Sequence, residues 1–185
     1  MNHYANITLQ GPEQSGVVEY LKGRGDSAFV ATGAKGVLVV FHEDLFSQEH
    51  LAARLSAKFS CPALLVMGFG PGVLLYHLYQ AGEQVDAYVS SPHEGLELAE
   101  PVPPGDAAIL CAAFAMERAQ RRVESILRKE GKPGQPYEYA VNRHGELLQA
   151  LGLPLFAAGT SFAAIEMGDL PAGGNFDPTG MQRAG

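Results

Sequence analysis

Three adjacent polar residues, His42, Glu43 and Asp44, are the densest cluster of side chains that could carry out acid–base chemistry or bind a metal ion. They follow the apolar run 37–41, typical of a strand, and precede a predicted helix, so a rigid scaffold would hold them. A zinc or iron site needs further ligands at a defined spacing, and with His50 the sequence does not form His-Glu-x-x-His. We therefore expect no metal site, and a turn is the simplest interpretation of the cluster.

A second group of candidate residues lies in two predicted strands, residues 73–79 and 84–89. His77 and Tyr79 share one face of the first strand, and Asp86 in the second could orient the imidazole. Together they could line a tyrosine-rich pocket for a small polar ligand. A hydrogen-bonded sheet histidine without a ligand is the other interpretation, and the pairing register that decides between them is not visible in a sequence. The candidate ligand-binding residues are thus His42, Glu43, His77, Tyr79 and Asp86.

Other motifs in the chain indicate structure and not chemistry. Residues 68–72 (Gly-Phe-Gly-Pro-Gly) precede an apolar strand and not a helix, so they predict a hairpin and no phosphate loop. Cys61 and Cys111 have apolar neighbours and are expected to be reduced core residues. Residues 93–94 (His-Glu) and 142–144 (Asn-Arg-His) are expected to be exposed, and no Ser/His/Asp or Cys/His set can be assembled from the sequence.

The hydrophobic pattern predicts an α+β fold: a ferredoxin-like βαββαβ two-layer sandwich with the sheet extended by a β-meander, plus C-terminal helices. Residues 4–9 alternate in the manner of a half-buried strand, and glycines at 33–36 predict a hairpin. The predicted strands are 4–9, 28–30, 37–41, 63–67, 73–79 and 84–89, and the predicted helices of this part are 12–23 and 47–59.

Three segments follow from changes in composition. Prolines between residues 90 and 105 mark a boundary, so we assign residues 1–92 to the sheet domain and 93–171 to a helical C-terminal part packed on it. That part is expected to hold one long helix from Asp106 to Gly131 and a second from 142 to 151, closed by Gly152 in a left-handed conformation. Residues 172–185 are rich in glycine and are expected to form a flexible tail.

Composition limits the classes of function. The 185 residues are 46% apolar and 18% charged, which suits one folded core. Thirteen basic against 20 acidic residues give a formal charge of −7, which speaks against nucleic acid as a partner. The sequence shows neither a secretion signal nor an apolar run long enough for a membrane span, so we expect a cytoplasmic protein that does not bind membranes. No cofactor motif is present.

Three stretches carry a resemblance: residues 82–92 (GEQVDAYVSSP), 150–154 (ALGLP) and 165–171 (IEMGDLP). On these the chain resembles a group of small bacterial proteins to which no activity is assigned. The shared motifs are turns and strand ends, so the resemblance implies no catalytic residue.

The sequence therefore predicts a noncatalytic binding or protein-interaction module. One expected partner is a basic protein, because a net negative charge accelerates association with a cationic surface. The other is a second copy of the chain, bound through an exposed strand edge or the long helix. The alternative is a small hydrolase or transferase in which His77, or His42 with Glu43, acts as general base in a tyrosine-lined pocket.

Overall fold

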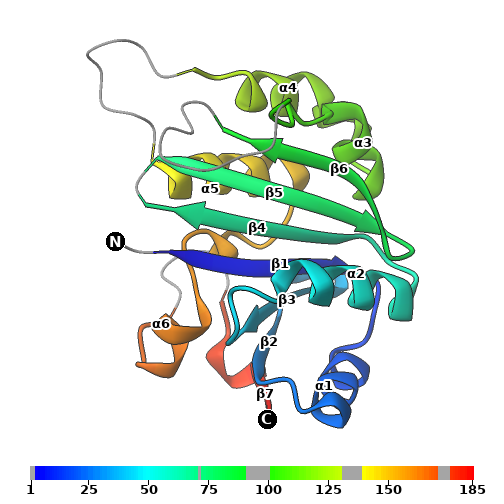
Figure 1. Cartoon of the computed structure of the whole chain (residues 1–185), viewed down its shortest axis with the longest axis vertical. Helices are drawn as coiled ribbons and strands as arrows, with labels where there is room; N and C mark the ends of the chain where they lie inside the picture. Colours follow the sequence, from blue (N-terminus) through cyan, green and yellow to red (C-terminus); the bar gives the residue numbers. More distant parts are fainter. Residues whose placement is uncertain (1–2, 71, 91–100, 131–138, 171–175) are drawn as a thin grey trace.

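Alternating apolar residues build one open antiparallel sheet that runs through the whole molecule (Figure 1). The computed structural model describes residues 3–70, 72–90, 101–130, 139–170 and 176–185, and these form a mixed α+β structure with seven strands and six α-helices. The strand order is β6-β5-β4-β1-β3-β2-β7. The strands are β1 (Tyr4–Gln10), β2 (Ala28–Thr32), β3 (Val37–His42), β4 (Ala63–Phe69), β5 (Val73–Gln80), β6 (Glu83–Val89) and β7 (Gln182–Ala184).

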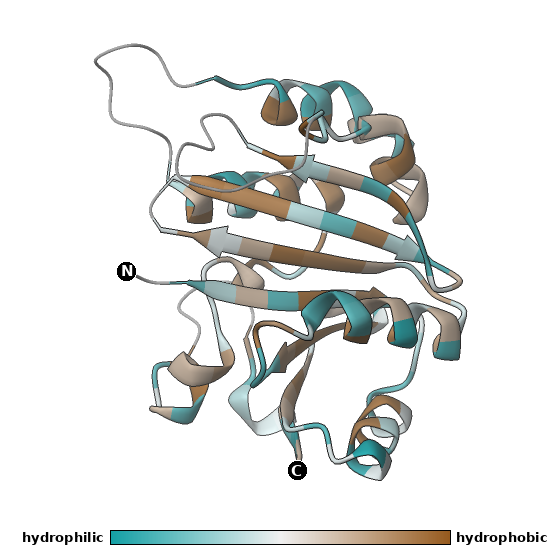
Figure 2. Ribbon diagram, viewed as in Figure 1, coloured by the Kyte–Doolittle hydropathy of each residue, from teal (hydrophilic) through white to brown (hydrophobic). Residues whose placement is uncertain are grey.

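Helices cover both faces of this sheet. On one face, α1 and α2 pack over a core that includes Ile7, Leu9 and Leu55. On the other face, the later helices pack over a second core (Figures 1 and 2). The helices are α1 (Gln14–Arg24), α2 (Gln48–Phe59), α3 (Ala107–Ala113), α4 (Gln120–Leu127), α5 (Ala140–Leu151) and α6 (Phe162–Glu166).

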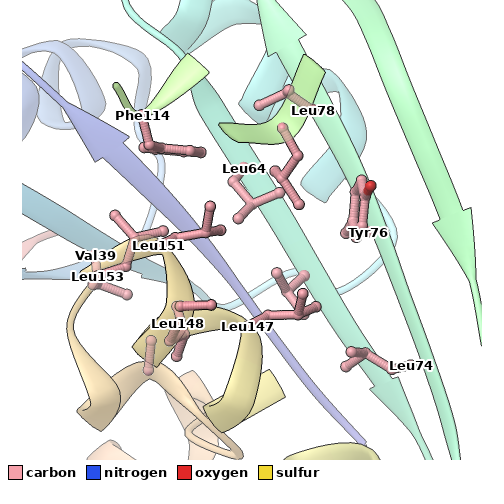
Figure 3. Packing of buried hydrophobic residues seen from close by; sticks show 14 of the residues in the cluster. Val39, Leu64, Leu74, Tyr76, Leu78, Phe114, Leu147, Leu148, Leu151 and Leu153 are labelled. Atoms are coloured by element: carbon pink, nitrogen blue, oxygen red, sulfur yellow. The ribbon is translucent and has the colours of Figure 1, made fainter. Parts of the chain in front are cut away.

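The second core is built largely from leucine side chains of the sheet and of α5. Figure 3 shows Leu64 and Leu78 from the strands directed toward Leu147 and Leu151 of the helix, with Phe114 beside them. Because this layer covers the sheet, β1 has helices on both sides, and all of its residues from Tyr4 to Leu9 are buried. The prediction of a half-buried first strand is therefore wrong: the polar residues of the alternation do not face solvent.

The predicted hairpins at 33–36 and 68–72 are confirmed, since β2 pairs antiparallel with β3 and β4 with β5. The predicted close of α5 is also confirmed. Gly152 has φ +67°, and Leu153 N donates to Leu148 O at 2.8 Å, the longer bond of a Schellman motif.

The single long helix expected from Asp106 is wrong, because the chain breaks it into α3 and α4. Ala115 takes a left-handed φ of +53°, and Met116 N donates to Cys111 O at 2.8 Å. This is the same helix-ending hydrogen bond as at α5, but it is made without glycine, which is why composition gave no sign of it. Asp106 does cap α3, accepting from Ala108 N and Ile109 N.

Strand β7 lies in the segment that the sequence predicts to be a flexible tail. It pairs with β2, and Ala184 is fully buried. The guanidinium group of Arg183 lies 5.2 Å from the centre of the Phe29 ring and donates to Glu166 at 3.0 Å. The last described residues therefore form one edge of the sheet. A three-residue strand with two polar members has too little apolar alternation to be recognised beforehand.

Candidate functional site

The His42-Glu43-Asp44 cluster stands at the end of β3, where it forms a turn into α2. Asp44 N donates to His42 Nδ1 at 3.2 Å, and Phe46 N donates to Asp44 Oδ1 at 2.8 Å. The Phe46 amide is the largest influence that lowers the pKa of the exposed Asp44 carboxyl, followed by the Ser47 hydroxyl. The buried Gln48 donates its amide to His42 O at 3.1 Å and Asp44 O at 3.0 Å. These bonds hold the turn at both ends.

A surface hollow of about 800 Å³ opens beside this turn. In its wall the Asp26 carboxylate, 18% exposed, attracts three basic side chains. Arg54 Nη2 lies 3.4 Å away, while Arg24 Nε and His42 Nε2 each lie 3.7 Å away. The hollow is lined by Gly25, Asp26, Ser27, His42, Glu43, Asp44, Ser47, His50 and Arg54.

Both ring nitrogens of His42 have protein neighbours. Its Nδ1 lies 3.2 Å from both the N and the O atom of Asp44, and its Nε2 faces Asp26. A general base needs a free lone pair within reach of the substrate. Both nitrogens of the buried His42 ring have partners within the molecule, so its geometry suits anchoring of the turn.

The same turn carries two exposed apolar side chains. Phe46 is 97% exposed and Leu45 is 42% exposed. They project from a segment whose neighbours, His42 and Gln48, are buried. The residues from Glu43 to Ser47 are called the β3–α2 loop below. This loop combines exposed aromatic surface with the carboxylates of Glu43 and Asp44.

His77 and Tyr79 are neighbours on the face of β5 that α2 covers. The Tyr79 hydroxyl lies 3.4 Å from His77 Nδ1, and Glu49 Oε1 lies 3.7 Å from the same nitrogen. Burial lowers the pKa of His77, while Glu49 and a hydrogen bond with the Gln84 side chain act in the opposite direction. Burial raises the pKa of Tyr79 to about 12, with Glu49 adding to the shift. A tyrosine shifted upward is a poor nucleophile at neutral pH.

Asp86 lies on the opposite face of the sheet from His77. The register pairs His77 with Ala87 and Leu78 with Asp86, so Asp86 projects beside Tyr76. The Tyr76 hydroxyl donates to Asp86 Oδ2 at 2.6 Å. Burial raises the pKa of Asp86, and the hydrogen bond from Tyr76 opposes this shift.

Asp86 also accepts from the backbone N–H of Asp106, at 3.1 Å, which fixes the start of α3. The five candidate residues therefore fall into three places. His42 and Glu43 share the hollow, His77 and Tyr79 share the α2 face of β5, and Asp86 lies across the sheet from them.

A buried polar strip on β1 escaped the sequence reasoning. Tyr4 Oη, Asn6 Oδ1 and Thr8 Oγ1 point to the α5 side of the sheet without a hydrogen-bond partner in the structure. The His144 ring stacks on the Tyr4 ring with centres 5.7 Å apart, and neither of its nitrogens is hydrogen-bonded. Burial lowers the pKa of His144 to about 3. The available signal was the repeat of polar side chains at positions 4, 6 and 8.

Arg143, expected to be exposed together with His144, is also buried. Its Nη1 donates to Ile126 O at 3.1 Å and to the Tyr88 hydroxyl, and its Nη2 donates to Lys129 O at 2.7 Å. Ile126 lies in the last turn of α4 and Lys129 two residues after its end, so Arg143 brings positive charge and donors to the helix terminus. The expectation that both residues are exposed is wrong, because α5 turns this side toward the sheet and α4.

The two cysteines belong to the core and carry no reactive thiol at the surface. Both Cys61 and Cys111 are free and buried, as expected, and burial raises the pKa of Cys61 to about 11. Residues 93–94 lie outside the described residues. Within the described ranges, no group of three His, Cys, Asp or Glu side chains is placed to hold a metal ion. The helices of these same ranges all fall short of the length and apolar character needed to span a membrane.

Comparisons with protein-family models, with curated proteins and with solved structures give no match to this chain.

Proposed function

We propose that the protein is a noncatalytic protein-interaction module and that the β3–α2 loop makes the central contact with its partner. The observation that carries this proposal is the 97% exposure of Phe46 on a loop fixed by hydrogen bonds. Exposed single apolar residues are common, but a large aromatic ring held clear of the surface is the type of side chain that dominates binding energy in interfaces.

The hydrogen bonds of the loop support this proposal through their effect on entropy. Asp44 is held by the His42 ring and by the Gln48 amide, and it in turn fixes the Phe46 backbone. Glu43 N donates to Ser27 O at 3.0 Å, which ties the loop to the residue just before β2. A loop that is ordered before binding loses little conformational entropy when the complex forms.

We also propose a ferredoxin-like unit within the sheet. The order β4-β1-β3-β2, with every pair antiparallel, and the packing of α1 and α2 on one face support this assignment. In such a unit the β3–α2 loop lies at one end of the sheet. The helices α3 to α6, which pack on the face opposite to α1 and α2, do not cover this end.

The hydrolase or transferase alternative is the weaker hypothesis. It requires a histidine with a free lone pair beside an acid. His77 and Glu49 form such a pair at 3.7 Å, but the Tyr79 hydroxyl and the Gln84 side chain also contact the ring. The separation of Asp86 from His77 removes the residue expected to orient it.

Site-specific photo-crosslinking in the native host tests the proposal. A benzophenone amino acid replaces Phe46 in one variant and Met167, which is 75% exposed near the end of α6, in the control. We expect position 46 to give a discrete crosslinked protein that position 167 does not give. Identical products from the two positions, or none from position 46, would show that the loop is not an interface.

A further inference from the structure

We infer that the partner bound by the β3–α2 loop is a protein that offers an apolar pocket for one aromatic ring, surrounded by lysine or arginine side chains. This inference rests on the proposed function and adds the chemistry of the partner. It follows from which charges stand around Phe46 and from which of them are already neutralised within the molecule.

The two arginines near the loop are engaged by Asp26. Arg24 and Arg54 both approach its carboxylate, at 3.7 and 3.4 Å, so this group of three has a net charge of +1. Two carboxylates stand in the loop and a third, whose Oε1 lies 3.7 Å from His77 Nδ1, in the first turn of α2, and together they leave the region with a net charge of −2. These are Glu43, Asp44 and Glu49.

The position of Asp44 ties this charge to the aromatic ring. Its Oδ1 accepts the Phe46 N–H at 2.8 Å, so a carboxylate stands at the base of the exposed side chain. Because the same hydrogen bond lowers the pKa of Asp44, the group stays ionised at neutral pH. A pocket that receives Phe46 thus brings its rim against negative charge, and a cationic rim is the complementary surface.

The same charges disfavour other macromolecules. Phosphate groups of nucleic acids and of anionic lipids would meet carboxylates at the loop, and the whole chain carries −7. A second copy of this chain would bring the same negative region and the same net charge. A basic protein has neither disadvantage, and long-range attraction would accelerate its encounter with the loop.

The test uses the protein recovered by crosslinking at position 46, purified and titrated against the full chain by surface plasmon resonance. Phe46→Ala should raise the dissociation rate about 30-fold, with Phe46→Leu between the two. Glu43→Gln combined with Glu49→Gln should lower the association rate about 3- to 10-fold in 50 mM salt, and the difference should largely vanish in 500 mM salt. Asp44 is left intact because it holds the loop.

The matched control removes two equal charges elsewhere, with Glu13→Gln just before α1 and Glu19→Gln on the exposed side of that helix. An association rate within about twofold of the wild type in this control, together with the losses above, supports a cationic rim. Equal losses in both double variants would show that only the net charge acts, and would overturn the inference.

Further outcomes separate the two proposals. A recovered protein whose binding needs Phe46 but responds neither to salt nor to Glu43 and Glu49 overturns the cationic rim and leaves the interaction module standing. Sedimentation of the wild type, but not of Phe46→Ala, with phosphatidylserine vesicles overturns the inference in favour of a membrane. Unchanged affinity for the recovered protein in Phe46→Ala overturns both proposals.

Discussion

Acid should destabilise this fold through His144, a histidine that the structure buries completely between α5 and β1. Among the residues that the structure describes, neither ring nitrogen has a hydrogen-bond partner, and burial is the influence that shifts the pKa of the ring. Burial therefore disfavours the protonated ring and lowers its pKa from 6.5 to about 3. In the unfolded chain the same ring takes up a proton near its ordinary pKa.

The direction in which the free energy of unfolding changes with pH follows from the number of protons that each state binds. Between pH 3 and 6.5 the unfolded state holds a proton on His144 that the folded state does not, so the free energy of unfolding rises with pH across this window. The contribution is complete above pH 6.5 and is lost as the pH falls toward 3. At about 1.4 kcal/mol per pH unit, the loss is about 2 kcal/mol at pH 5 and approaches about 5 kcal/mol at pH 3.

Urea unfolding, followed by circular dichroism at pH 8, 6.5 and 5, measures this loss. His144→Phe keeps a ring for the stack on Tyr4 but carries no titrating nitrogen, so it should lose about 2 kcal/mol less than the wild type between pH 8 and 5. His50→Gln, which removes an exposed histidine, should follow the wild type. Equal pH dependence of wild type and His144→Phe, or an NMR titration of folded His144 near pH 6.5, would refute the reasoning.

Three further perturbations test the packing. Arg143→Met should cost about 3 kcal/mol in urea unfolding because it leaves the end of α4 without its buried donors, whereas Arg122→Met, at an exposed bond, should change stability by less than about 0.5 kcal/mol. Gly68→Ala should cost about 1 to 3 kcal/mol, since a Cβ atom there would lie 2.2 Å from the Tyr4 ring, while Gly72→Ala, with open space around it, should be nearly neutral. Ending the chain before β7 should expose the edge of β2 and produce self-association in sedimentation velocity, where the full chain gives a smaller species.

The sequence was sufficient for the first six strands because each carries a run of apolar residues long enough to show its period. It was insufficient where structure depended on few residues or on unusual ones. The break at Ala115 uses a left-handed alanine, and β7 has three residues, of which only Ala184 is buried. In both places tertiary contacts stabilise a conformation that local propensity does not favour.

The candidate site was harder to predict because it depends on register. A strand sequence tells which residues share a face, as His77 and Tyr79 do, but not which residue of the next strand lies opposite. The pairing of His77 with Ala87 sends Asp86 to the other side of the sheet, a difference of one position. Burial of β1 on both faces had a similar effect, since its alternation appeared to mark a solvent side and instead marked a polar strip in the core.

Among the described residues, His42, His77 and His144 are the histidines that the fold buries wholly or in part. His42 has a backbone N–H on one nitrogen and faces Asp26 with the other, while His77 is contacted by three side chains. His144 has free nitrogens, but the interior of the protein encloses them. Of these three rings, His42 and His77 have partners within the molecule and His144 has no access to solvent. Phe46 is the opposite case, because Asp44 holds its backbone while its side chain is 97% exposed, and this contrast is the reason that we propose it as the contact with a partner.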